Sequence, residues 1–275
     1  MIGDTLRVWA DKFLDFFLMF LLLGVITATL SYTLSYLVTG IPSSGAGALP
    51  LPGAGTTTPD PTSAVILGLS NGILTGIATA FFMAAGVHMA FQTHRKGAAT
   101  IAQSFSEGVK RFVSVLVAGI LIELMILGML FVPLVVVLTG ALAGDLLLAG
   151  IGLLALLALI PIAIYLFLSF AVYAPVIVVE GAGAIAGLQR SWAYMRGRRL
   201  SYLGSAIVIG LLTVIISLPL GLVPVAARLA GGTGAGLVTG FVASVLSTAL
   251  TASLAIILAA VAGHVLMSRQ PQAPA

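Results

Sequence analysis

Six long stretches of apolar residues constrain this chain more than any other feature of its sequence. Most of each stretch carries no charge, and the stretches run roughly over Phe13–Val38, Ala64–Thr93, Phe112–Leu138, Leu146–Val179, Leu200–Ala226 and Leu237–Met267. A helix needs about 20 mostly apolar residues to cross a bilayer. The sequence therefore predicts an all-α polytopic membrane protein with six transmembrane helices in a single integral domain, residues 1–275. The fourth stretch is long for one span, and its Pro161 and Pro175 predict a kinked or tilted helix.

The composition excludes several other classes of protein. Charged residues make up only 7% of the 275 residues and hydrophobic residues 60%, whereas a soluble domain is about 25% charged. This excludes a soluble fold, a disordered chain and a nucleic-acid-binding protein. The absence of cysteine excludes disulfides, thiolate metal sites and cysteine nucleophiles. The histidines lack a carboxylate at ligand spacing, so we expect no metal and no other cofactor.

The basic residues are distributed unevenly between the connections. Arg228 stands alone after the fifth stretch. The other eleven of the twelve Lys and Arg fall before the first stretch, between the second and third, between the fourth and fifth, or after the sixth: Arg7, Lys12, Arg95, Lys96, Lys110, Arg111, Arg190, Arg196, Arg198, Arg199 and Arg269. Loops rich in Lys and Arg stay in the cytoplasm. We therefore expect a multi-pass protein of the cytoplasmic membrane with both termini cytoplasmic, and a first stretch that is retained as a helix rather than cleaved as a signal peptide.

A short amphipathic segment precedes the first, third and fifth stretches. Aligning Trp9, Phe105 and Trp192 places cations and small residues at similar offsets. The pattern predicts three repeats, residues 1–96, 97–182 and 183–269, each an interfacial amphipathic helix followed by a transmembrane hairpin, with residues 270–275 as a disordered tail. The alternative is that the three segments are unrelated to one another, since amphipathic segments often precede membrane spans.

Small residues recur every four positions in the second and sixth stretches. One row is Gly68, Gly72, Gly76, Ala80, Ala84 and His88; the other is Gly232, Gly236, Gly240, Ser244, Thr248 and Ala252, and it continues to His264. A four-residue row forms one ridge of a helix, and small residues let two helices approach closely in lipid. We expect both helices in the core of the bundle, although some rows arise by chance in a chain with 32 glycines.

Glu123 is the most conspicuous polar residue inside a span. It lies about 18 Å beyond Arg111 along a helix, which is close to the bilayer midplane. A carboxylate there costs at least a few kcal/mol unless it is paired or protonated. With His88 and His264 it forms a candidate intramembrane polar site. The residue either binds two helices together as a neutral carboxyl or handles protons or cations, and an intramembrane enzyme would need Glu123 and His88 to converge.

The segment between the fourth and fifth stretches is the most distinctive part of the chain. A proline leads to an acidic residue and a glycine, then to a Gly-Leu pair, Arg-Ser-Trp and a glycine before the next span: Pro175, Glu180, Gly181, Gly187, Leu188, Arg190, Ser191, Trp192 and Gly197. This segment resembles the signature of the six-span membrane domain attached to some glycerophosphodiester phosphodiesterases, and of related stand-alone prokaryotic membrane proteins. The resemblance implies a membrane module rather than a catalyst, because a separate soluble barrel performs the hydrolysis in those enzymes.

The same segment also has a physical interpretation of its own. Leu188, Trp192 and Met195 can face lipid while Gln189 faces water, so the helix would lie in the headgroup layer. Its candidate lipid-headgroup contacts are Arg190, Trp192, Arg196, Arg198 and Arg199. Each arginine is worth about 1 kcal/mol of attraction to anionic lipid. The alternative is that these bases only set the topology.

The sequence as a whole favours a non-enzymatic integral membrane module that associates with membrane lipids, with anionic headgroups among them, or with a membrane-protein partner. The alternative is a small transporter or channel that uses Glu123 at the midplane. The sequence gives no oligomeric state.

Overall fold

The computed structural model describes residues 2–39, 61–95 and 100–268, and every regular element within them is a helix. The helices are α1 (Ile2–Asp11), α2 (Phe13–Thr39), α3 (Pro61–His94), α4 (Ile101–Ala143), α5 (Leu146–Phe170), α6 (Tyr173–Glu180), α7 (Ala184–Met195) and α8 (Arg199–Ser268). Six segments are long and apolar enough to cross a membrane: Phe13–Val38, Ile66–His94, Ile101–Ala143, Leu146–Glu180, Arg199–Ala227 and Gly234–Ser268. The predicted fold class is confirmed.

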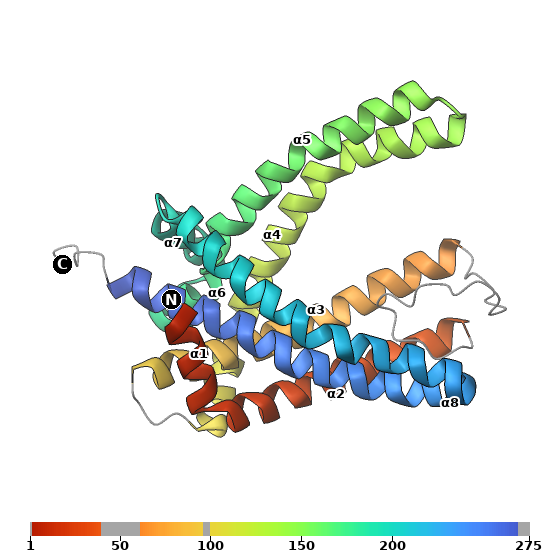
Figure 1. The fold of residues 1–275 in the computed structure, drawn as a ribbon. Helices are drawn as coiled ribbons and strands as arrows, with labels where there is room; N and C mark the ends of the chain where they lie inside the picture. The colour runs from red at the N-terminus through yellow and green to blue at the C-terminus, as the bar shows by residue number, and fades with distance from the viewer. Residues whose placement is uncertain (1, 40–60, 96–99, 269–275) are drawn as a thin grey trace.

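Helix α8 contains two of these spans. It has 70 residues, and Figure 1 shows it doubling back at the end of the molecule far from both termini. We call Arg199–Ala227 the first leg and Gly234–Ser268 the second leg. Tyr202 and Ile209 of the first leg share a buried cluster with Leu254 of the second. The connection predicted at residues 228–236 is therefore where the chain turns, although its backbone is helical.

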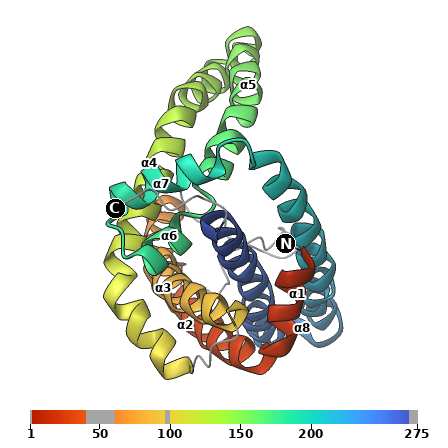
Figure 2. The ribbon, with the colours of Figure 1, turned by 90° about the vertical axis from the view of Figure 1, so that its left-hand side faces the viewer.

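Three of the six spans form the packed bundle, and the other three lie around it. In α2, α3 and the second leg of α8, 33%, 44% and 56% of the most apolar 18-residue window of the span is buried. In α4, the α5–α6 span and the first leg of α8, the shares are only 6%, 11% and 6%. The core of the bundle includes Phe16, Phe20, Val87, Met89 and Ile257, which are buried. Figure 2 looks along this bundle from the end where the termini lie.

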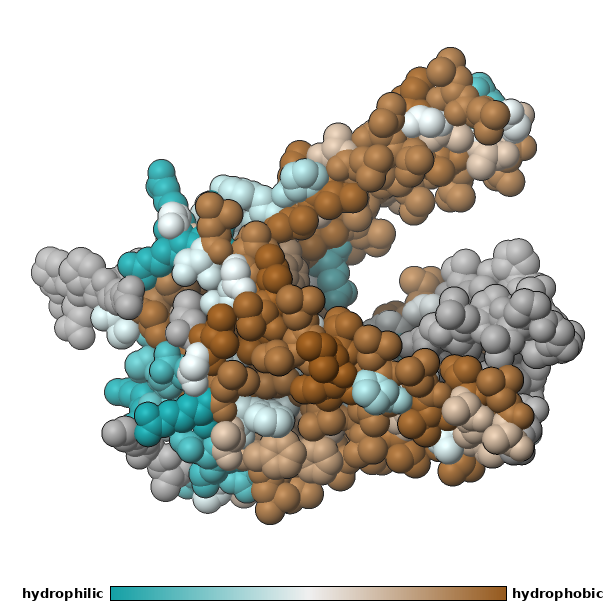
Figure 3. Space-filling view, viewed as in Figure 1, coloured by the Kyte–Doolittle hydropathy of each residue, from teal (hydrophilic) through white to brown (hydrophobic). Residues whose placement is uncertain are grey.

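Helices α4 and α5 form an arm that stands away from the bundle. Figure 3 shows the arm as an apolar projection with an open notch between it and the bundle. The hairpin is closed by Gly144, whose φ of 70° suits glycine, and by Asp145, which accepts hydrogen bonds at 3.0 Å from the backbone N–H groups of Leu147 and Leu148. The arm is therefore a self-contained hairpin.

The fourth span is broken rather than bent. Helix α5 continues through Pro161 to Phe170, and α6 begins at Tyr173. Pro175 lies in the first turn of α6, where a missing N–H breaks no helical bond. The break thus precedes Pro175, and Pro161 does not end the helix.

Polar residues gather at one end of the molecule. Figure 3 shows the hydrophilic surface at the end that contains α1, α7 and the start of α4. This grouping agrees with the charge distribution of the sequence. The predicted tail, residues 270–275, lies outside the described residues, as do Lys96, Arg269 and the side chain of Arg228.

The predicted repeat has only part of its expected form. Helices α1 and α7 are separate amphipathic helices, but the middle amphipathic segment is the first part of the continuous helix α4. The threefold repeat stays a prediction.

The first glycine row lies partly outside the core. Gly68, Gly72 and Gly76 have open space where a Cβ would stand, whereas Ala80 and Ala84 are buried. The expectation was wrong for the glycines because they lie in the half of α3 that is remote from the core. Gly24 of α2, which belongs to neither row, makes a closer approach: a Cβ there would be 2.6 Å from the carbonyl oxygen of Val245.

Gly24→Ala should therefore destabilise the bundle by about 1–3 kcal/mol, because the added methyl meets backbone that cannot move aside. Gly72→Ala is the matched control, since nothing lies within 4 Å of its Cβ position and alanine favours a helix. Denaturant unfolding in detergent micelles, followed by circular dichroism, measures both. Equal unfolding midpoints for the two variants would contradict the close contact between α2 and the second leg of α8.

Candidate functional site

The three residues of the predicted intramembrane polar site lie in different places. The Nδ1 atom of His88 is 3.4 Å from the hydroxyl of Ser104 at the start of α4. The ring of His264 packs against those of Phe91 and His94, with centroid distances of 5.1 and 4.7 Å. Among the described residues, no hydrogen bond or ion pair joins any two members of the proposed site. Glu123 lies about 28 Å beyond Ser104 along α4, so the structure does not bring it together with His88.

Glu123 is exposed on α4, five residues beyond Ala118, which belongs to the buried core. One turn before Glu123 is Gly119, whose Cβ position would be 3.5 Å from the hydroxyl of Tyr173. That hydroxyl donates to the sulfur of Met83 at 3.4 Å, and it lies within electrostatic range of Glu123. Thioether sulfur is a weak acceptor. Tyr173 is thus the polar neighbour of Glu123, and the sequence pattern did not reveal it because Tyr173 is 50 positions further along the chain.

Helix α7 contains Arg190 and is followed directly by Arg196, Arg198 and Arg199, and its inner face is fixed to the protein. Gly187, Ser191 and Met195 follow one another at four-residue spacing and are all buried. The hydroxyl of Ser191 donates to the carbonyl of Ser169 at 3.1 Å. Met195, which the sequence placed toward lipid, is fully buried beside Tyr202. That expectation was wrong because this face of α7 packs against α5, α6 and α8.

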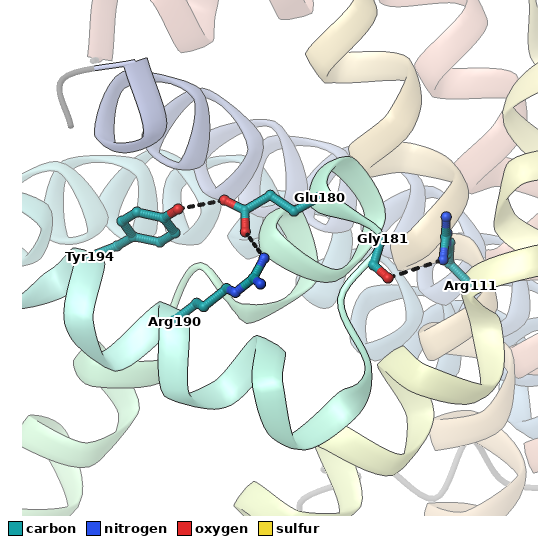
Figure 4. A network of polar contacts seen from close by, with 5 residues as sticks. All are labelled: Arg111, Glu180, Gly181, Arg190 and Tyr194. Carbon is teal, nitrogen blue, oxygen red and sulfur yellow. Dashed lines mark hydrogen bonds and ion pairs between the residues drawn. The ribbon is translucent and has the colours of Figure 1, made fainter. Parts of the chain in front are cut away.

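Glu180 joins α6 to α7 (Figure 4). Its carboxylate accepts hydrogen bonds from Arg190 at 2.7 Å and from the hydroxyl of Tyr194 at 2.6 Å. Arg111 of α4 donates to the carbonyl of Gly181 at 3.4 Å, and Gly181 ends α6 with a φ of 67°. Glu180 and Arg190 thus form an ion pair that joins α6 to α7. Burial first, and then the hydrogen bond to Glu180, raise the pKa of Tyr194 to about 12.

Arg199, the first residue of α8, lies against two aromatic rings. Its guanidinium carbon is 4.2 Å from the ring centroid of Tyr165 and 4.9 Å from that of Trp192. Its Nη1 atom donates to the Tyr165 hydroxyl at 2.8 Å. Such contacts stabilise a cation by about 0.5–2 kcal/mol. Of the five predicted headgroup contacts, the structure thus brings Trp192 and Arg199 together, and it adds Tyr165 of α5, which the sequence did not indicate.

The remaining predicted headgroup contacts are divided. Arg190 forms the ion pair with Glu180, while Arg196 and Arg198 flank Gly197 in the turn between α7 and α8, where the φ of Gly197 is 77°. An open depression of about 340 Å³ lies beside Trp192, lined by Phe170, Ile185, Leu188, Gln189 and Trp192. The described residues contain no group of three side chains able to hold a metal ion.

Comparison with known proteins gives one match. A family model described as a domain of unknown function, DUF7847, matches residues 15–266. No curated protein and no solved structure matches the chain. The match covers the six spans except for the first two residues of the first and the last two of the sixth.

The raised pKa of Tyr194 makes a prediction about alkaline pH. Because the folded protein favours the protonated phenol, the contribution of this group to stability is fully present below its ordinary pKa of 10.0 and is lost as the pH rises toward 12. Subtracting the tyrosinate absorbance of Tyr194→Phe from that of the wild type isolates the titration of Tyr194. We expect a midpoint near 12 and a lower one in a Glu180→Gln background. A midpoint near 10 in the wild type would contradict the contact with Glu180.

Proposed function

Because the chain belongs to the DUF7847 family, whose function is unknown, we propose a role from its own geometry. The protein is a non-enzymatic integral module of the cytoplasmic membrane whose basic end binds anionic lipid headgroups and there presents a surface to a membrane partner. The observation that carries this proposal is the placement of α7, which is fixed to the protein on one side and, together with the residues that follow it, carries four arginines at the polar end of the spans.

The packing of α7 supports a permanent position at the membrane surface. An amphipathic helix that is free in solution binds a membrane reversibly. Here Ser191 and Met195 attach the helix to the transmembrane spans, so Arg190, Arg196 and Arg198 stay near the headgroups. The excess of Lys and Arg at this end supports its assignment to the cytoplasmic side, where the anionic lipids of the inner leaflet lie.

The resemblance of residues 174–205 to the membrane domain of glycerophosphodiester phosphodiesterases supports the same interpretation. In those enzymes the membrane domain accompanies a separate catalytic barrel. The corresponding role here is support or recruitment at the membrane rather than hydrolysis.

A transporter or channel is the second candidate, and one observation favours it. Glu123 is exposed on α4, five residues beyond Ala118 of the buried core, and the hydroxyl of Tyr173 lies within electrostatic range of it. Intramembrane carboxyls often belong to ion or proton pathways. The wall of the notch formed by the arm is mostly apolar, which favours the non-transporting role.

Lipid retention tests the headgroup proposal. The protein is reconstituted in vesicles with equal amounts of phosphatidylglycerol and phosphatidylcholine and extracted in mild detergent, and the bound lipid is identified by mass spectrometry. We expect enrichment of phosphatidylglycerol that falls with added salt. Changing Arg190, Arg196, Arg198 and Arg199 together to Gln should reduce the enrichment at least about tenfold, since each arginine is worth about 1 kcal/mol.

The matched control changes four other basic residues at the polar end of the molecule to Gln: Arg7, Lys12, Arg95 and Lys110. Its enrichment should stay closer to that of the wild type. Equal losses in both variants would show that the arginines of the α7 segment act only through total charge, which is the outcome expected if they merely set the topology. Thermal unfolding establishes that both variants are folded.

Proteoliposome flux tests the role of Glu123. Across a panel of solutes and a pH gradient, we expect the same background flux for wild type and Glu123→Gln, and equal unfolding midpoints, because the non-transporting protein does not use this exposed carboxyl. Flux in the wild type that is lost in Glu123→Gln would overturn this expectation and support the transporter.

A further inference from the structure

Arg199 has more hydrogen-bond donors than the protein satisfies. A guanidinium carries five N–H groups, and the only side-chain oxygen that accepts from it in the described part of the chain is the Tyr165 hydroxyl. Its Nε and Nη2 atoms are buried without a hydrogen-bond partner. The rings of Tyr165 and Trp192 face the cation and stabilise its charge. Neither ring supplies an acceptor in the plane of the guanidinium, where the N–H groups point.

In the described part of the chain, no carboxylate accepts the remaining N–H groups of Arg199. Glu180, the acidic residue that bonds to α7, already accepts from Arg190 and Tyr194. Among the described residues no ion pair involves Arg199. The oxygens of a phosphate match the fork of a guanidinium and accept two N–H bonds at once. The unpaired N–H groups of Arg199 therefore need an acceptor from outside the chain, and an oxyanion fits them best.

The depth of the cluster indicates where that oxyanion comes from. Arg199 begins a membrane span, and Tyr165 lies about 8 Å inside the end of α5. Trp and Tyr side chains concentrate at this level of a membrane, between the headgroups and the hydrocarbon. Phosphates of the lipid headgroups lie at the same level, directly beside the spans.

An apolar surface for an acyl chain adjoins the cation. The ring of Trp192 lies between Arg199 and the depression of about 340 Å³ that Phe170, Ile185 and Leu188 line. The rings of Trp192 and Phe170 are 5.6 Å apart, and Ile185 is 64% exposed. The volume is at the small end of ligand-binding pockets, which begin at about 300 Å³. It suits part of one hydrocarbon chain rather than a whole soluble ligand.

We infer that Arg199, Tyr165 and Trp192 form a site for one anionic glycerophospholipid of the surrounding bilayer. The phosphate accepts from the guanidinium of Arg199, and an acyl chain lies in the depression next to Trp192. To reach Nε and Nη2, the phosphate displaces the indole of Trp192, which is 36% exposed. The site rests on the proposed function and narrows headgroup binding from a basic surface to a single position.

The chain offers a direct reporter of this site. It has two tryptophans, Trp9 and Trp192, so Trp9→Phe leaves Trp192 as the only indole. The protein is placed in nanodiscs of phosphatidylcholine that contain increasing fractions of phosphatidylglycerol with brominated acyl chains, which quench a nearby indole. A second series uses brominated phosphatidylcholine in phosphatidylglycerol. Comparing the two series within one variant cancels any change in the position of Trp192 itself.

We expect Trp192 to be quenched by the anionic lipid at lower fractions than by the zwitterionic one, with a relative affinity of about fivefold. Arg199→Gln should reduce this preference to about one. Arg196→Gln, which removes the same charge from the adjacent turn, should keep most of it. Tyr165→Phe keeps the ring but loses the hydrogen bond to Arg199, and it should give an intermediate preference even if Arg199→Gln folds poorly.

The outcomes separate the site from the broader proposal. If the wild type prefers anionic lipid and Arg199→Gln and Arg196→Gln reduce the preference equally, the single site is overturned and diffuse headgroup binding stands. If the wild type shows no preference, both are overturned. Excess inorganic phosphate should leave the quenching unchanged. A loss of quenching on adding phosphate would show that the site takes the free anion rather than a bilayer lipid.

Discussion

One short buried helix connects the arm, the bundle and α7. Helix α6 has only eight residues, yet the residues from Ala174 to Val178 are all buried. Pro175 fills the space over Gly263 of α8, and Ile177 that over Gly187 of α7. Tyr173 reaches α3 through Met83. Because lipid supplies no hydrophobic force between helices, close packing is what orders them. Helix α6 provides this packing where the arm, the bundle and α7 meet.

This arrangement divides the basic residues of the α7 segment into different physical situations. Arg190 is neutralised by Glu180, and the ion pair contributes little because the arginine side chain is 53% exposed. Its main effect is to orient α7. Arg199 is stacked between rings and lacks acceptors. A count of positive charges in the sequence treats the two residues as equal, whereas their surroundings give one a structural role and leave the other with donors to offer a ligand.

The spans followed from the sequence because the length of an apolar run needs no knowledge of its neighbours. The division into bundle and arm could not be predicted from the sequence, because lipid and protein interiors favour the same apolar residues. The run in α4 is as apolar as that of any span, yet few of its residues are buried. For the same reason Met195 was assigned to lipid and the glycines of α3 to the core. The pairing of Glu180 with Arg190 was within reach because its members are ten residues apart, whereas Arg199 with Tyr165, or Glu123 with Tyr173, depends on how separate helices cross.

The contacts of α2 have a consequence for how the protein is made. Its partners are in the last span: Gly24 meets Val245, the ring of Tyr32 meets that of Phe241, and in the preceding α1 the indole of Trp9 donates to Ser253, 244 residues later in the chain. Ribosomes add about 5–20 residues per second, so the first helices wait roughly 10–50 s in the bilayer for their partner. The hairpin of α4 and α5, by contrast, pairs within itself as soon as it emerges. Biogenesis therefore leaves α2 and α3 without this neighbour until the second leg of α8 has been made, and a chain truncated before residue 234 would keep the arm but lack the helix against which α2 packs.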